Sequence, residues 1–165
     1  MSDLQNLFLI DSRVQRISIP LVFDTGATRT VISESIAERT RAIPLNHTVR
    51  VGGNGGIVAD VPLFKMKCLE IGNSVVDELN VIVVPDGQLD FGTDEFGNVL
   101  KVNGFLGWDV ISQFRWVIDP LQRTFKVEKP EISITKGQLT WDHMPIIQAQ
   151  YQDQLLYFAF DSGNT

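Results

Sequence analysis

Two segments of the sequence repeat each other at a separation of 137 residues, from Asp24 to Asp161. Residues 21–28 read Leu-Val-Phe-Asp-Thr-Gly-Ala-Thr, and residues 158–165 read Phe-Ala-Phe-Asp-Ser-Gly-Asn-Thr. In each copy an apolar strand-like run ends in Asp-[Thr/Ser]-Gly, and the apolar residues 7–10 have an echo at 144–147. A repeat this long indicates a duplicated small domain rather than a solenoid unit. The fold must therefore place two similar strand-and-turn units in one chain.

The composition leaves few kinds of catalytic side chain. The chain has 14 Lys and Arg against 20 Asp and Glu, a net charge of −6, which argues against a nucleic-acid or anionic-membrane partner. No apolar run approaches the roughly 20 residues of a membrane-spanning helix, and no secretory signal is visible. One cysteine and two histidines disfavour a disulfide, a Cys/His zinc site and a histidine-assisted nucleophile. We therefore expect carboxylate chemistry without metal or cofactor, in a cytoplasmic protein.

Short apolar runs separated by turn residues predict an all-β chain. Residues 17–23 place apolar side chains at every second position, on one strand face. Pro20 within them favours an edge strand or a strand whose central N–H is unused. Helical signal is confined to residues 33–39, with serines available as N-cap, and 108–114. The acidic residues 90–98 are expected to form a surface loop. Further strands are expected at 57–61, 63–71, 75–84, 115–119 and 124–128, with turns at 54–55, 72–73, 86–87 and 120–123.

The paired Asp-[Thr/Ser]-Gly triplets have a clear chemical use. One triplet alone is weak evidence, because Asp and Gly are common in strand-ending turns. Two carboxylates held within a few ångströms cannot both ionise, so one can activate water while the other donates a proton to a carbonyl oxygen. The glycines allow the two backbones to approach, and the Thr and Ser hydroxyls can bond across the pair. The candidate catalytic residues are Asp24 and Asp161, supported by Thr25, Gly26, Ala27, Thr28, Ser162 and Gly163.

These motifs resemble the retropepsin-like aspartic peptidases. Residues 23–28 are similar to the first active-site loop, and residues 160–163 to the second-lobe loop of the two-lobed, pepsin-type arrangement. Residues 102–109, Val-Asn-Gly-Phe-Leu-Gly-Trp-Asp, resemble the apolar-apolar-Gly segment that crosses behind the catalytic loop. Residues 51–57 resemble the glycine-rich flap over the substrate, and the missing Lys-[Ser/Thr] argues against a phosphate cradle. The expected substrate-binding flap residues are Gly52, Gly53, Asn54, Gly55 and Gly56.

The resemblance implies a fold and a division of the chain. Residues 1–130 would form a closed, barrel-like, all-β acid-protease lobe with one or two short helices. Residues 131–165 would form a linker and the opening strands of a second lobe, which is truncated. Three features depart from the family. The flap lacks the tyrosine of pepsins, the second lobe lacks its own flap, apolar-Gly segment and helix, and residues 90–98 have no family counterpart.

The resemblance also implies an aspartic endopeptidase that cleaves peptide or protein substrates. The chain would be a fragment of a longer two-lobed enzyme, a reading favoured because the sequence ends in mid-motif. Two alternatives stay open: a homodimer using Asp24 of each subunit, and a catalytically inactive peptide-binding domain on the same fold. The apolar tail strand 144–160 is expected to pair with another copy or pack on the first lobe. No nucleic-acid or membrane partner is expected.

Overall fold

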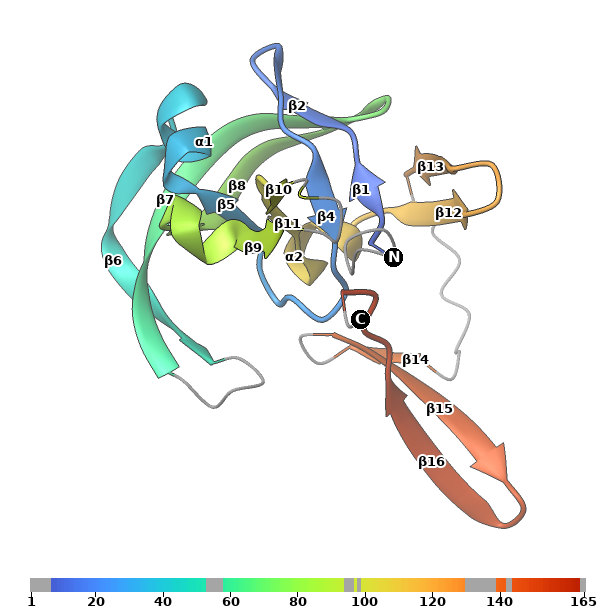
Figure 1. Cartoon of the computed structure of the whole chain (residues 1–165). Helices are drawn as coiled ribbons and strands as arrows, with labels where there is room; N and C mark the ends of the chain where they lie inside the picture. The colour runs from blue at the N-terminus through green and yellow to red at the C-terminus, as the bar shows by residue number, and fades with distance from the viewer. Residues whose placement is uncertain are drawn as a thin grey trace.

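Strands make up most of the computed structural model, which describes residues 7–52, 58–93, 97, 99–129, 139–141 and 144–163. Within these ranges there are two short α-helices, α1 (Glu34–Arg39) and α2 (Trp108–Ile111). Figure 1 shows a strongly curved sheet that forms a half-barrel, with a long hairpin projecting from the body near the C-terminal end. The predicted all-β, barrel-like fold with one or two short helices is confirmed.

The main sheet delivers the first aspartate to its centre. Nine strands form this sheet, and β4 pairs antiparallel with β1 and parallel with β11. Asp24 directly follows β4, and its backbone N–H donates to the carbonyl of Leu106 at 3.0 Å, which extends the pairing by one residue. The strands in sheet order are β1 (Leu9–Ile10), β4 (Leu21–Phe23), β11 (Gly104–Leu106), β5 (Val31–Ser33), β8 (Ser74–Val84), β7 (Val58–Ile71), β2 (Ser12–Val14) and β3 (Ile17–Ser18), with β6 (Ile43–Gly52) paired to β7.

The strand predicted over residues 17–23 is interrupted at Pro20. Ile19 and Pro20 lie between β3 and β4, because proline has no N–H to continue a ladder. Before the proline, β3 lies at one end of the sheet order, as an edge strand does, whereas β4 after it has neighbours on both sides. Both predicted ways of accommodating Pro20 are thus partly met, because the proline itself lies between the two strands. The predicted apolar face is confirmed, because Phe23 and the apolar residues at 19 and 21 share one core cluster. Val22 belongs to a second cluster on the opposite face.

Three turn and loop predictions have different outcomes. The turn at Gly72-Asn73 is confirmed: it joins β7 to β8, and Gly72 has the positive φ of 56° that favours glycine. A 3-10 helix, η2 (Asp86–Leu89), replaces the turn predicted at 86–87. The loop predicted over 90–98 is also wrong in part, because β9 (Asp90–Thr93) pairs with β10 (Val99–Lys101).

The two helices and the strand β7 differ little from their predicted ranges. Helix α1 begins at Glu34, and the Ser33 side chain caps it by accepting the Ile36 N–H. Helix α2 stops at Ile111, earlier than the predicted 114, where the Ile111 carbonyl accepts the Trp116 indole N–H at 2.9 Å. The two strands predicted at 57–61 and 63–71 are one strand, β7, in which Cys68 has a φ of 55°.

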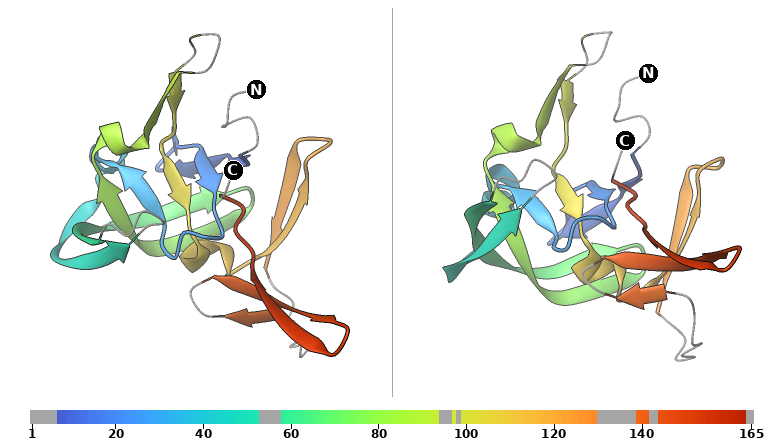
Figure 2. Two further views of the ribbon diagram at one scale, coloured as in Figure 1. Left: turned by 60° about the horizontal axis from the view of Figure 1, so that its bottom comes forward. Right: turned by 90° about the horizontal axis from the view of Figure 1, so that it is seen from below.

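The C-terminal third forms two smaller sheets beside the main one (Figure 2). The hairpin of β12 (Arg115–Asp119) and β13 (Thr124–Glu128) matches the predicted strands and turn. The other sheet contains β14 (Leu139–Trp141), β15 (Pro145–Tyr151) and β16 (Gln154–Ala159). The base of the β15–β16 hairpin lies against the body, where Ile147 and Phe160 border an apolar cavity of about 410 Å³ together with Trp108 and Trp116. The far end of this hairpin leaves several large apolar side chains exposed.

Candidate active site

The sequence repeat is also a structural repeat. In both copies a short antiparallel strand pair ends at the aspartate, and the pairing register is identical after a shift of 137 residues. The hydrogen bond at the aspartate end of each strand pair is also repeated. Phe23 N–H donates to Phe8 O at 2.7 Å, and Phe160 N–H donates to Pro145 O at 2.9 Å. The first copy pairs Leu9 with Val22 and Ile10 with Leu21, and the second pairs Ile146 with Ala159 and Ile147 with Phe158.

Four hydrogen bonds join the two Asp-[Thr/Ser]-Gly loops to each other. The Thr25 hydroxyl donates to Phe160 O at 2.7 Å and accepts the Ser162 N–H at 2.9 Å. The Ser162 hydroxyl donates to Phe23 O at 3.0 Å and accepts the Thr25 N–H at 3.1 Å. The predicted bonding of these hydroxyls across the pair is therefore present, and it relates the two loops by an approximate twofold axis.

The glycines of the two loops bring the carboxylates together. A Cβ added to Gly26 would overlap the carboxyl group of Asp161, and one added to Gly163 would overlap that of Asp24. The Gly26 N–H donates to Asp24 Oδ1 at 2.9 Å, and the Gly163 N–H donates to Asp161 Oδ1 at 3.0 Å. Ala27 adds a third bond, from its N–H to Asp24 Oδ1 at 3.2 Å. Each aspartate is therefore oriented by its own loop and faces the glycine of the other.

The environment of Asp24 shifts its pKa. Burial raises the pKa of Asp24 above its ordinary value of 3.8, and the neighbouring Asp161 carboxyl raises it further. The N–H groups of Gly26 and Ala27 act in the opposite direction by stabilising the carboxylate.

A third aspartate, Asp109, is bonded to the residue Thr30 that follows the first loop, and the sequence analysis did not single it out. Asp109, in α2, accepts the Thr30 N–H at 2.9 Å and the Thr30 hydroxyl at 2.8 Å through Oδ1. The Thr30 hydroxyl in turn accepts the Gly107 N–H at 3.1 Å. Burial raises the pKa of Asp109, and its buried Oδ2 has no hydrogen-bond partner among the residues that the structure describes. The sequence signal that could have identified Asp109 is its position at the end of residues 102–109, the segment that resembles the family's apolar-apolar-Gly motif.

The remaining predicted site residues are Thr28 and the five residues of the predicted flap. Thr28 is exposed, and its carbonyl accepts the Asp109 N–H at 3.3 Å. Gly52 ends β6 and pairs with Val58, so β6 and β7 lead into and out of the predicted flap. Gly53, Asn54, Gly55 and Gly56 lie outside the described residues.

The described ranges hold no metal-ligand cluster and no membrane-spanning helix. No group of three or more His, Cys, Asp or Glu side chains is placed to hold a metal ion in them. No helix in the same ranges is long and apolar enough to cross a membrane.

A half-barrel sheet with two cross-bonded Asp-[Thr/Ser]-Gly loops defines an aspartic-protease type of fold and site. Residues 10–110 match the aspartyl protease family, and because this is more than half of the chain, the chain belongs to that family. It is thus a protease of the peptide-hydrolysing class. A crystal structure of a retropepsin-like aspartic protease from Rickettsia conorii is 17% identical over 68% of this chain and 84% of that one, with a TM-score of 0.44. No curated protein matches the chain significantly.

Proposed function

We propose that the chain is an aspartic endopeptidase whose dyad is Asp24 and Asp161. The observation that carries this proposal is the reciprocal bonding of Thr25 and Ser162, which holds both carboxylates together within one chain. The glycine positions support it as well, because each faces the carboxyl group of the opposite loop.

In the proposed mechanism the two acids share one proton. The ionised member removes a proton from water, and the protonated member donates its proton to the carbonyl oxygen of the scissile bond. Which residue takes which role is left unassigned, because a coupled pair titrates as a unit. The loop N–H groups keep the carboxyl oxygens oriented, and the peptide would lie extended between the dyad and the tip of the β6–β7 hairpin.

The arrangement within one chain favours this dyad over a homodimeric one. A site built from Asp24 of each subunit would require residues 160–163 to leave their place and break four hydrogen bonds. We also propose that residues 1–130 form the first lobe and residues 131–165 a linker and the opening of a second. The identical register of the two strand pairs supports this division. A longer two-lobed enzyme stays a prediction.

The test compares Asp24→Asn and Asp161→Asn with the parent in cleavage of a mixed peptide library at acidic to neutral pH. Both variants should reduce cleavage to background, whereas Asp77→Asn, at an exposed position of β8, should retain it. Full activity of Asp161→Asn beside an inactive Asp24→Asn would instead favour the homodimer. Peptide binding by the parent without cleavage would favour an inactive binding domain.

A further inference from the structure

We propose that two copies of this chain associate through β16, the outer strand of the C-terminal hairpin, and form one continuous antiparallel sheet. Figure 1 shows this hairpin projecting from the body, so its far end is accessible to a second copy. The pairing uses a strand edge rather than the aspartate loops, and each dyad would stay within its own chain. It therefore differs from a homodimer that builds the site from Asp24 of two subunits, and it does not depend on the proposed function.

The outer edge of β16 has free backbone groups. In the described ranges β16 pairs with β15 alone, whereas β14 covers part of the other edge of the hairpin. The bond from Phe160 N–H to Pro145 O fixes the orientation of β16, because residues with bonds to the neighbouring strand alternate with residues without them in an antiparallel ladder. Such an open edge is a template for a further strand. The residues whose N–H and C=O groups point outward are Leu155, Tyr157 and Ala159.

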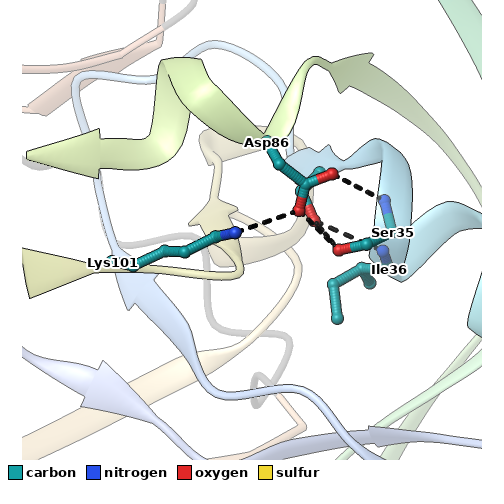
Figure 3. Close-up of polar contacts among 5 residues, drawn as sticks. Ser35, Ile36, Asp86 and Lys101 are labelled. Atoms are coloured by element: carbon teal, nitrogen blue, oxygen red, sulfur yellow. Dashed lines mark hydrogen bonds and ion pairs between the residues drawn. The ribbon is translucent and has the colours of Figure 1, made fainter. Parts of the chain in front are cut away.

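The hairpin lacks the charged side chains that keep strand edges apart in many proteins. Asp153, in the turn, is the single charged residue within 144–160. The other short strands of this protein do carry charges: β12 and β13 each contain a basic and an acidic residue. Figure 3 shows a third case, Lys101 of β10, whose ammonium lies 3.4 Å from Asp86 Oδ1. Because β16 has no charged residue, a second copy of it can pair without repulsion.

The hairpin also exposes an apolar face whose counterpart in the first copy is buried. In the first copy, the inward-facing apolar side chains at positions 10, 21 and 23 are at most 5% exposed. After the shift of 137 residues, their counterparts are 41–52% exposed, and these are Ile147, Phe158 and Phe160. Removing such side chains from water favours association.

The edge of β16 is its own complement, which makes a second copy the partner. Two identical antiparallel strands are related by a twofold axis, and this pairing closes with two copies. A register centred on Tyr157 uses every outward residue, because Leu155 then lies opposite Ala159 of the second copy. The two strands would exchange about six backbone hydrogen bonds. The same register places Leu156 opposite Phe158 of the second copy, an aliphatic–aromatic pair that stabilises antiparallel sheets.

The experiment makes one substitution at two exposed tyrosines of the hairpin. Tyr157 lies on β16 and is 60% exposed, and Tyr151 lies on β15 and is 65% exposed. Sedimentation velocity of the full chain over a range of concentrations should show the parent shifting from the mass of one chain to that of two. Tyr157→Lys sets two ammonium groups opposite each other and should weaken the dimer about tenfold or more, whereas Tyr151→Lys should leave it unchanged.

Hydrogen exchange of the parent gives a second measurement that needs no variant. The amides of Leu155, Tyr157 and Ala159 should be protected together at high protein concentration and should lose this protection on dilution. The amides of Leu156 and Phe158 should stay protected in both conditions, because they bond to β15. This alternation along one strand distinguishes edge pairing from a general stabilisation of the hairpin.

Four results would overturn the inference. They are a parent that stays a single chain at every concentration, a dimer that both lysine variants weaken equally, outward amides that exchange freely in the dimer, and larger assemblies without a dimer. If Tyr157→Lys does not fold, the exchange pattern of the parent decides. No readout requires peptide cleavage, so failure here leaves the proposed dyad standing, and a parent that cleaves no peptide leaves the dimer standing.

Discussion

Replacing Thr25 with valine removes the hydroxyl that serves two of the four bonds between the paired loops. Valine has nearly the shape of threonine, so the buried site, where Thr25 is 3% exposed, keeps its packing. The bond to Phe160 O and the bond from Ser162 N–H are both lost. The two groups that lose their partner are the backbone carbonyl of Phe160 and the backbone N–H of Ser162. Each is costly to leave unpaired where water cannot replace the lost hydroxyl.

The expected loss follows from the bonds removed. Each hydrogen bond contributes about 1 kcal/mol net, and a dry backbone group left unpaired adds about 1 kcal/mol or more. Thr25→Val should therefore weaken docking of the second loop by about 2–4 kcal/mol. The cost cannot exceed the free energy of docking itself, because the tail segment can detach without unfolding the half-barrel.

Hydrogen exchange of the Thr25 amide measures this docking, because its N–H donates to Ser162 Oγ only while the loops are together. A loss of about 2 kcal/mol should make that amide exchange about 30-fold faster. Amides in the β7–β8 hairpin serve as the internal reference and should not change. Peptide cleavage should fall in proportion to the fraction of molecules in which the two loops are in contact.

Thr25→Ser is the matched control, because it keeps the hydroxyl and reproduces the Ser162 of the other copy. It should retain most of the protection and activity. The reasoning is refuted if Thr25→Val exchanges and cleaves like Thr25→Ser. A double variant with Ser162→Ala should cost less than the sum of the single changes, since one detached loop cannot detach twice.

Three further predictions concern the carboxyl groups. The raised pKa of Asp24 makes the folded state lose stability as pH rises above 3.8, so Asp24→Asn should resist urea better than the parent at pH 7 but not at pH 3. Gly163→Ala, whose methyl would overlap the Asp24 carboxyl, should lower kcat/KM about 100-fold or more. Asp109→Ala should lower the unfolding free energy by about 2 kcal/mol at pH 4 through loss of the Thr30 bonds. That cost should shrink at pH 8, because burial raises the pKa of Asp109.

Local sequence patterns predicted the elements that depend on local physics. The apolar alternation of residues 17–23 gave the correct buried face, and Gly72-Asn73 gave the correct two-residue turn. The repeated triplets predicted that Thr25 and Ser162 would bond across the pair, because each hydroxyl follows an aspartate at the end of an apolar strand.

Other features that depend on contacts between distant residues were not predicted. The sequence of residues 90–98 has no alternating apolar pattern that would predict a strand. The strand β9 depends instead on its pairing with β10 and on the packing of Phe91 against the distant Phe105. Asp109 gained its role only when folding brought it to Thr30, 79 residues earlier in the chain. The missing N–H of Pro20 was predicted, but the sequence did not show that the run would divide there into an edge strand, β3, and an interior strand, β4.

The four hydrogen bonds between the loops have a consequence for proteolysis of this protein. The loops of Asp24 and Asp161 belong to one polypeptide, so they meet intramolecularly. A single cleavage between Glu128 and Met144 would divide the pair between two chains. Their association would then depend on protein concentration, and dilution would separate the carboxylates. For an enzyme that hydrolyses peptide bonds, self-cleavage in this connection would act as a concentration-dependent means of inactivation.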